Sequence, residues 1–397
     1  MMKKMLPTNL KYAGHLIGLI LICACCSNPQ DNHRDTQDVR TIILTSERND
    51  NPALLNSFFA YKHHIALETN DSCLLRHLSK IQCYKGDIYL SDRFTRKIYA
   101  FSKEGKFKRA YDHYGNGPGE YLYLTDFCIR QDTLHILGRD RWLRYTLDDT
   151  FLDARPVEPG IGLYAFPDDR LALNRGLGAA TGGDSHYSYS FYASGKKIFE
   201  DVPFNPHLTG RAFTKGEGAN SFYTYDDTVF ALFPFNDTIY TVNKQDGTLS
   251  PCLAISTPAN GKKEIRPDAG RQEINKALRE GASPRMHAFH KWGEYVFFIY
   301  TNPQGNWQYV LARENGEVVF QGSPRLDDNC LPFHIVPYES DNPHRPVMSV
   351  LRPESIGFKV HAGKSKVLDE LARTVNLEDN PILVFYEPKF LMSTDGQ

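Results

Sequence analysis

Residues 86–121 read GDIYLSDRFTRKIYAFSKEGKFKRAYDHYGNGPGEY, and this stretch decides the fold. Two short alternating segments, Asp87–Ser91 and Lys97–Phe101, flank a polar turn. A second turn, Lys103–Lys106, leads into a third segment. Apolar residues that alternate between charged or glycine-containing turns predict β-strands joined as hairpins. The stretch therefore predicts one small antiparallel sheet that ends in the glycine-rich loop Gly115–Tyr121.

Weaker copies of this unit recur downstream with an irregular period of roughly 40 to 65 residues. They lie at residues 127–151, 164–200, 222–256, 291–321 and, less clearly, 334–351. The strands carry apolar residues on both faces, as in Ile88–Leu90 and Ile98–Phe101, which suits sheets packed between neighbouring sheets. We therefore predict a ring of blades, in which Arg40–Leu44 closes the ring against Ile382–Tyr386.

Two segments have helical rather than strand periodicity. Asp268–Gly281 places Ile274 and Leu278 one turn apart, and Ser365–Val375 places Leu368 and Leu371 on one face. We expect both to be short insertions in an otherwise all-β chain.

The loop GNGPGEY, followed by Asp126-Phe127 and preceded by IYLSD and KIYAFSKEGKF, also carries a resemblance. With these motifs the chain resembles the six-bladed β-propeller lipoproteins of the Bacteroidota cell envelope, which are distantly similar to NHL-repeat propellers. The segment Asp379–Tyr386 near the C-terminus agrees with that family. The resemblance implies an all-β, six-bladed β-propeller with short helical insertions over residues 39–397. The family is largely uncharacterised, so the resemblance implies a fold and a compartment but no activity.

The first residues predict an export signal. Lys3 and Lys4 precede an apolar run, Ala13–Ile22, that is too short to span a bilayer. The run leads into Ile22-Cys23-Ala24-Cys25, which looks like a bacterial lipoprotein signal. We predict a signal peptide over 1–24, lipid on the Cys25 thiol and a polar tether over 25–38, with Cys26 as a poorer lipidation site. The alternative is an ordinary secretory signal, and in either case the mature chain is exported.

Composition excludes some partners. The formal net charge is −1 and no long basic run occurs, which argues against nucleic acid. Beyond the signal region five cysteines remain: Cys73, Cys83, Cys128, Cys252 and Cys330. A Cys73–Cys83 bridge is allowed outside the cytoplasm, although small buried thiols are the default interpretation. No metal-binding spacing appears, so we expect no metal and no cofactor.

The glycine-rich loop is not a phosphate-binding loop, because Pro118 and Glu120 stand where such a loop needs Lys and Ser or Thr. We expect its glycines to adopt left-handed backbone angles in a tight crossing between blades. The candidate ligand-binding residues are aromatic and arginine side chains that suit a sugar or a peptide. They are Arg139, Arg141, Trp142, Tyr164, Trp292 and Trp307, for which blade core and ordinary surface charge are the competing interpretation.

No GxSxG, HExxH or Ser/Thr–Lys pattern is present, so no catalytic residue is predicted. The sequence thus favours a non-catalytic binding or scaffold module for a glycan, peptide or protein partner. It would be held by a lipid anchor in the bacterial cell envelope, at the outer membrane. The alternative is a propeller enzyme, a lyase or hydrolase acting on polysaccharide or peptide at a site in the axial funnel.

Overall fold

The structure is a computed structural model, and it separates residues 1–38 from a compact unit, Val39–Gln397. It describes residues 39–45, 57–177, 186–209, 220–256, 265, 268–279, 286–301, 307–322, 335–336, 338–340, 342, 345–357 and 366–391. The predicted signal peptide, the tether and Cys25 lie outside these residues, as does Cys330.

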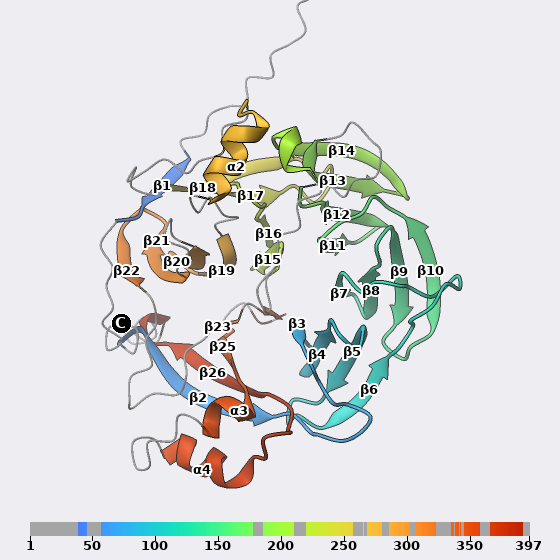
Figure 1. The fold of residues 1–397 in the computed structure, drawn as a ribbon, viewed down its shortest axis with the longest axis vertical. Helices are drawn as coiled ribbons and strands as arrows, with labels where there is room; N and C mark the ends of the chain where they lie inside the picture. Colours follow the sequence, from blue (N-terminus) through green and yellow to red (C-terminus); the bar gives the residue numbers. More distant parts are fainter. Residues whose placement is uncertain are drawn as a thin grey trace, which may run out of the picture. The chain divides into compact units, whose positions relative to one another are not determined.

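The compact unit is a six-bladed β-propeller, as predicted (Figure 1). Blade one comprises β3 (Leu78–Tyr84), β4 (Asp87–Asp92), β5 (Lys97–Phe101) and β6 (Phe107–Tyr111). Blade two comprises β7 (Asp126–Arg130), β8 (Thr133–Leu137), β9 (Arg141–Thr146) and β10 (Phe151–Pro156). Blade three comprises β11 (Gly162–Phe166), β12 (Arg170–Asn174), β13 (Tyr187–Ala193) and β14 (Lys196–Pro203).

The other three blades follow the same antiparallel order. Blade four comprises β15 (Phe222–Tyr225), β16 (Thr228–Ala231), β17 (Thr238–Val242) and β18 (Leu249–Ser256). Blade five comprises β19 (Met286–Trp292), β20 (Tyr295–Thr301), β21 (Trp307–Arg313) and β22 (Val318–Gly322). Blade six comprises β23 (Ile335–Val336), β25 (Val347–Leu351), β26 (Ile382–Pro388) and β2 (Phe59–Ala66).

The meander order gives the propeller two different faces. The first strand of each blade lies nearest the axis (Figure 1). Connections within the first and last strand pairs lie at one end of the propeller and include the two-residue turn Lys85–Gly86, so we call this end the short-turn face. Connections between second and third strands and from blade to blade lie at the other end and include those that carry the helices, so we call this end the long-loop face.

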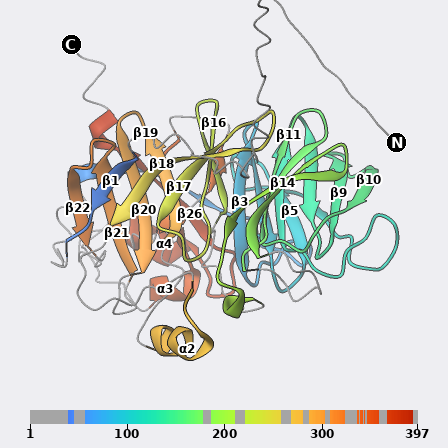
Figure 2. The same ribbon diagram turned by 90° about the horizontal axis from the view of Figure 1, so that it is seen from above.

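Helical insertions lie in the long connections. They are η1 (Pro206–Leu208), α2 (Arg271–Arg279), α3 (Pro353–Gly357) and α4 (Lys366–Thr374), while η2 (Lys389–Leu391) follows the last strand. Figure 2 shows α2 and α3 at the same end of the propeller. Both helices predicted from periodicity are therefore confirmed within a few residues at each end.

The N-terminal segment closes the ring, but with a different strand from the one predicted. β2 pairs antiparallel with β26 and so becomes the outer strand of blade six. The predicted closing strand is wrong: β1 (Arg40–Ile43) pairs in parallel with β18 as a fifth strand of blade four. The physical reason is burial, because Ile42 and Leu44 are inserted into the apolar cluster between blades four and five.

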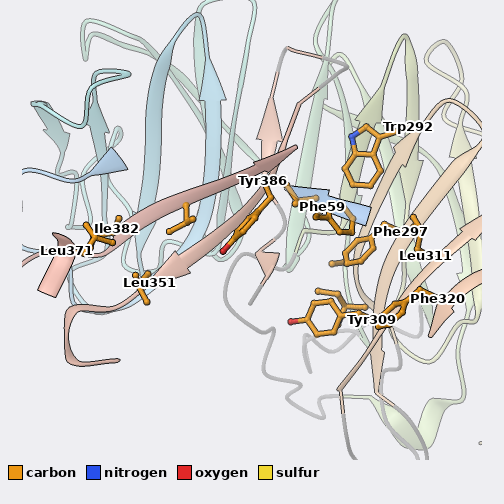
Figure 3. Packing of buried hydrophobic residues seen from close by; sticks show 14 of the residues in the cluster. Phe59, Trp292, Phe297, Tyr309, Leu311, Phe320, Leu351, Leu371, Ile382 and Tyr386 are labelled. Atoms are coloured by element: carbon orange, nitrogen blue, oxygen red, sulfur yellow. The ribbon is translucent and has the colours of Figure 1, made fainter. Parts of the chain in front are cut away.

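Apolar side chains fill the spaces between neighbouring blades. In the space between blades five and six, Phe59 of β2 packs edge-on against Trp292 and Phe297 (Figure 3). Fully burying such a side chain contributes about 1.5–3 kcal/mol. Because Phe59 comes from the first third of the chain and Trp292 from the last, this contact holds the ring closed.

A buried amide joins the same closing region. Asn380, just before β26, donates to the carbonyl oxygens of Glu68 and Cys73, both at 2.7 Å, and accepts from the Leu75 amide at 2.8 Å. The segment between β2 and β3 is therefore fastened to the C-terminal strand. Cys73 and Cys83 are not joined by a disulfide, so the bridge considered from the sequence is not formed.

Candidate functional site

The glycine-rich loop Gly115–Tyr121 is a compact crossing from blade one to blade two. Its ends are joined by hydrogen bonds from the Gly115 amide to the Tyr121 carbonyl (3.2 Å) and from the Tyr121 amide to the His113 carbonyl (2.9 Å). Inside it, the Glu120 carboxylate accepts from the Gly117 amide at 2.7 Å. The predicted blade-to-blade crossing is confirmed.

The reason predicted for its glycines is wrong. Gly115, Gly117 and Gly119 are absent from the residues with left-handed backbone angles. They are glycines because neighbours occupy the space of a side chain: a Cβ on Gly115 would lie 2.0 Å from a carboxylate oxygen of Glu120. A Cβ on Gly119 would lie 3.0 Å from the ring of Phe151. Close packing, rather than a left-handed backbone angle, favours glycine at these positions.

The folded loop forms one wall of a surface pocket of about 260 Å³, which we call the Tyr–Arg pocket. The other wall is the turn between β8 and β9. The pocket is lined by Gly115, Asn116, Glu120, Tyr121, Leu122, Tyr123, Gly138, Arg139, Asp140 and Arg141. Both walls belong to the long-loop face, because one connects two blades and the other joins a second to a third strand.

Large apolar side chains are unusually exposed around this pocket. Tyr123 in the lining and Tyr114 beside it are each 53% exposed, and Leu122 is also exposed. The Arg96 guanidinium lies 4.7 Å from the centre of the Tyr114 ring, a cation–π contact. The buried Tyr121 donates its hydroxyl to the Arg96 carbonyl at 2.9 Å. The aromatic surface is therefore held in place by contacts beneath it.

The polar groups of the pocket include both hydrogen-bond donors and acceptors. Arg139, Asp140 and Arg141 are exposed in the β8–β9 turn. Arg141 donates one guanidinium hydrogen bond to the Gly117 carbonyl at 3.2 Å, which fastens the turn to the glycine loop. A guanidinium has five N–H groups, so Arg141 retains donor capacity for a ligand. The carboxylates of Glu120 and Asp140 supply acceptors.

The six residues predicted from the sequence are not brought together. Arg139 and Arg141 line the pocket, but the adjacent Trp142 is only 1% exposed. The Trp142 indole donates to Nδ1 of His135 at 3.1 Å, and the Arg144 guanidinium lies 5.4 Å from its ring centre. Trp142 is part of the packing of blade two.

The remaining predicted residues lie elsewhere. Trp292, also 1% exposed, donates to the Arg345 carbonyl at 3.1 Å and belongs to the core between blades five and six. Tyr164 is buried on the inner strand β11, with the Arg130 guanidinium 4.4 Å from its ring centre. Trp307 stands in β21, and its side chain lies outside the described part of the structure.

Sequence reasoning missed the tyrosines and Glu120. Tyr114 and Tyr123 flank the glycine loop at positions where no strand alternation continues, and that position is the signal that would have marked them as surface groups. Their common exposure depends on the fold of the loop.

The axial region contains a second group of polar side chains, and these connect blades. Lys80 of β3 forms a buried ion pair with Asp126 of β7 at 3.1 Å. The second carboxylate oxygen of Asp126 accepts from the Leu163 amide of β11 at 2.9 Å. Blades one, two and three are thus joined through one carboxylate.

Toward the short-turn face, the segment between β23 and β25 reaches into the axial region. Its strand β24 (Glu339–Ser340) pairs in parallel with β3, and Arg345 donates to the Thr224 carbonyl of β15 at 2.9 Å. Within the described residues, no three His, Cys, Asp or Glu side chains are grouped so as to hold a metal ion. The axial groups described here join blades to one another.

The fold, the ring closure and the surface pocket define a six-bladed β-propeller with a pocket at one face. The chain belongs to the family described as Domain of unknown function (DUF4934), which matches residues 39–387. No curated protein matches the chain.

Three solved structures are similar to this chain to different degrees in sequence identity, TM-score and coverage. A putative exported protein from Bacteroides fragilis NCTC 9343 is 20% identical, with a TM-score of 0.69 over 88% of this chain and 99% of that one. A member of the duf4221 family from Bacteroides vulgatus is 9% identical, with a TM-score of 0.49 over 83% and 97%. Streptogramin B lyase is 11% identical, with a TM-score of 0.40 over 74% and 78%. The TM-score of the Bacteroides fragilis protein shows that it shares the propeller fold with this chain.

The Bacteroides fragilis protein is described as a putative exported protein. Among the described residues, no helix has the length and apolar character needed to span a membrane.

Proposed function

We propose that this chain is an exported, lipid-anchored protein of the cell envelope whose propeller is a non-catalytic binding module. The Tyr–Arg pocket is its ligand-contact surface, and the ligand is a glycan, a peptide or a protein. The observation that carries the proposal is the pair of half-exposed tyrosines, Tyr114 and Tyr123, beside the arginines of the pocket.

Exposed aromatic rings of this kind favour binding for an energetic reason. Each leaves apolar area in water, and removing such area contributes about 25 cal/mol per Å² when a ligand covers it. A tyrosine also loses little conformational entropy on binding, because it has only two side-chain torsions. The Arg96 contact and the hydrogen bonds of the loop pre-organise Tyr114, which lowers the entropic cost of binding further.

The strand topology places the start of the folded unit and the pocket on opposite faces of the propeller. β1 runs parallel to β18, a fourth strand that ends at the long-loop face, so Arg40 lies at the short-turn face. A lipid on Cys25 would be joined to that face by a tether that reaches roughly 50 Å at full extension. The pocket lies on the opposite face, so attachment of the tether leaves the pocket uncovered.

The proposal is tested by presenting the full chain to a printed array of glycans and peptides. We expect at least one class of feature to retain the wild-type chain and to release the Tyr114→Ala/Tyr123→Ala variant. Tyr61→Ala is the matched control, because Tyr61 is an exposed tyrosine on β2 in blade six. Retention of nothing, or equal retention of the pocket variant, would remove the Tyr–Arg pocket as a binding surface.

A further inference from the structure

The polar lining of the Tyr–Arg pocket restricts the chemistry of what binds there. Arg139 and Arg141 offer donors, Glu120 and Asp140 offer acceptors, and the Asn116 amide offers both. These groups come from two short segments and share about 260 Å³. A ligand that complements them needs several groups that donate and accept within a small volume.

We propose that the ligand is a neutral carbohydrate chain, an inference that rests on the proposed binding function. Each sugar hydroxyl both donates and accepts a hydrogen bond. Adjacent hydroxyls of one ring can therefore pair with an arginine and a carboxylate at the same time. The C–H face of the same ring is apolar and covers an aromatic side chain such as Tyr123.

The lining disfavours a small anion. Two arginines alone would suit phosphate or sulfate, because a guanidinium pairs with such groups through two hydrogen bonds. Glu120 and Asp140 lie in the same lining, and their negative charge opposes an anion. A ligand without net charge keeps both sets of hydrogen bonds and avoids this repulsion.

The position of the pocket disfavours an extended peptide. Peptides that bind to β-folds commonly add a strand to an open sheet edge, where backbone hydrogen bonds supply affinity. The walls here are the loop between β6 and β7 and the turn between β8 and β9. These walls present side chains and no run of unpaired strand backbone that a peptide could extend.

The size of the pocket sets the length of the bound segment. Pockets that enclose a small ligand commonly have volumes of about 300–1,000 Å³. At about 260 Å³, the Tyr–Arg pocket holds a short segment of a longer chain. The exposed Leu122 of the lining and Tyr114 beside the pocket then provide surface for adjoining sugar units.

The test measures binding of the full chain to four neutral hexasaccharides, namely maltohexaose, cellohexaose, xylohexaose and mannohexaose. Hexa-alanine and inorganic phosphate form the peptide and anion arms, and calorimetry supplies the dissociation constants. We expect binding of at least one hexasaccharide, weakened roughly tenfold or more by Tyr123→Ala and by Arg141→Ala. Tyr123→Phe should retain binding, because the aromatic face is kept.

Two exposed residues away from the pocket serve as controls. Tyr61→Ala removes a tyrosine from blade six, and Arg373→Ala removes an arginine from α4. Both should leave the dissociation constant unchanged. Circular dichroism confirms that each variant is folded, and all the substituted side chains are exposed.

The hexasaccharide, hexa-alanine and phosphate titrations distinguish failure of the carbohydrate inference from failure of the proposed binding function. If hexa-alanine or phosphate binds with the same sensitivity to Tyr123→Ala while no hexasaccharide does, the carbohydrate assignment is overturned and the pocket remains a binding surface. If no probe binds, the carbohydrate inference is overturned. If a hexasaccharide binds equally well to all variants, the inference and the proposed pocket both fail.

Discussion

His135 and His290 are buried imidazoles whose protonation the native structure opposes. Burial, followed by the charge of Arg144, lowers the pKa of His135 to about 3. Nδ1 of His135 also accepts the hydrogen bond from Trp142, so that nitrogen is unprotonated. Burial and then Arg345 lower the pKa of His290 well below 6.5. Neither ring nitrogen of His290 has a hydrogen-bond partner in the described structure.

These shifts predict loss of stability in acid. Well above pH 6.5 both histidines are neutral in the folded and unfolded states, so neither contributes to pH dependence there. Below pH 6.5 the unfolded chain takes up protons that the folded chain excludes. The free energy of unfolding therefore falls as the pH drops toward 3, by up to about 1.4 kcal/mol per pH unit for each histidine.

The measurement is urea unfolding at several pH values for the wild type and for His290→Phe. Because His290 has no hydrogen bond to lose, the variant should retain its stability near pH 7.5 and show a shallower pH dependence between pH 6 and 4. His207→Phe, at an exposed histidine, controls for the loss of a histidine that is not buried. An unaltered slope in His290→Phe would contradict the assignment.

At the scale of an element, β1 is a short strand that joins two blades. Ile42 is fully buried between blades four and five, while Ile43, on the other side of the strand, is 66% exposed. The Gln321 side chain accepts from the Thr45 amide at 3.0 Å and donates to the Thr45 carbonyl at 2.8 Å. Strand β1 and the residues after it are therefore held by the buried Ile42 and Leu44 side chains and by the two hydrogen bonds of Gln321.

The two neighbouring isoleucines give a matched prediction. Ile42→Ala should lower the free energy of unfolding by about 2–5 kcal/mol, because it removes buried methyl groups and leaves a cavity. Ile43→Ala should change it by less than about 0.5 kcal/mol, as expected of a surface substitution. Denaturant unfolding of both variants is the check, and equal effects would mean that β1 is not docked on blade four in solution.

At the scale of the whole molecule, the chain begins its folded unit at one face and carries its pocket on the other. This arrangement has functional meaning only if the anchor predicted at Cys25 exists. Lipidation supplies about 0.8 kcal/mol per buried methylene group, so several acyl chains would hold the protein on a membrane for long times. With such an anchor, the chain would be attached to the membrane from the short-turn face, and the pocket on the long-loop face would stay uncovered.

The anchor is tested in the native host by substituting each neighbouring cysteine. Cys25→Ser should abolish incorporation of labelled palmitate and move the protein from the detergent phase to the aqueous phase. Cys26→Ser should leave both unchanged. Membrane retention of Cys25→Ser, or loss of labelling only in Cys26→Ser, would place the anchor elsewhere or remove it.

Much of the fold was predictable because its evidence is local. The strands of blade one and both helices follow from alternation and helical spacing over a few residues, as in Asp87–Ser91 and Ser365–Val375. The candidate site was predictable only in part. Arg139 and Arg141 were identified, but Trp142 next to them was assigned to the same surface although it lies in the core. A residue type suggests a ligand, whereas exposure depends on which neighbours cover it.

Residue order alone thus specifies a repeating all-β chain, since hydrophobic period and turn chemistry act between residues that are close in sequence. Contacts between distant segments specify the rest. They place β1 on blade four instead of blade six, because Ile42 and Leu44 find an apolar groove there. They also favour the small Gly119 in the glycine-rich loop, since the Phe151 ring of blade two lies in the space beside it. The Tyr–Arg pocket exists only where that loop meets the turn of the next blade.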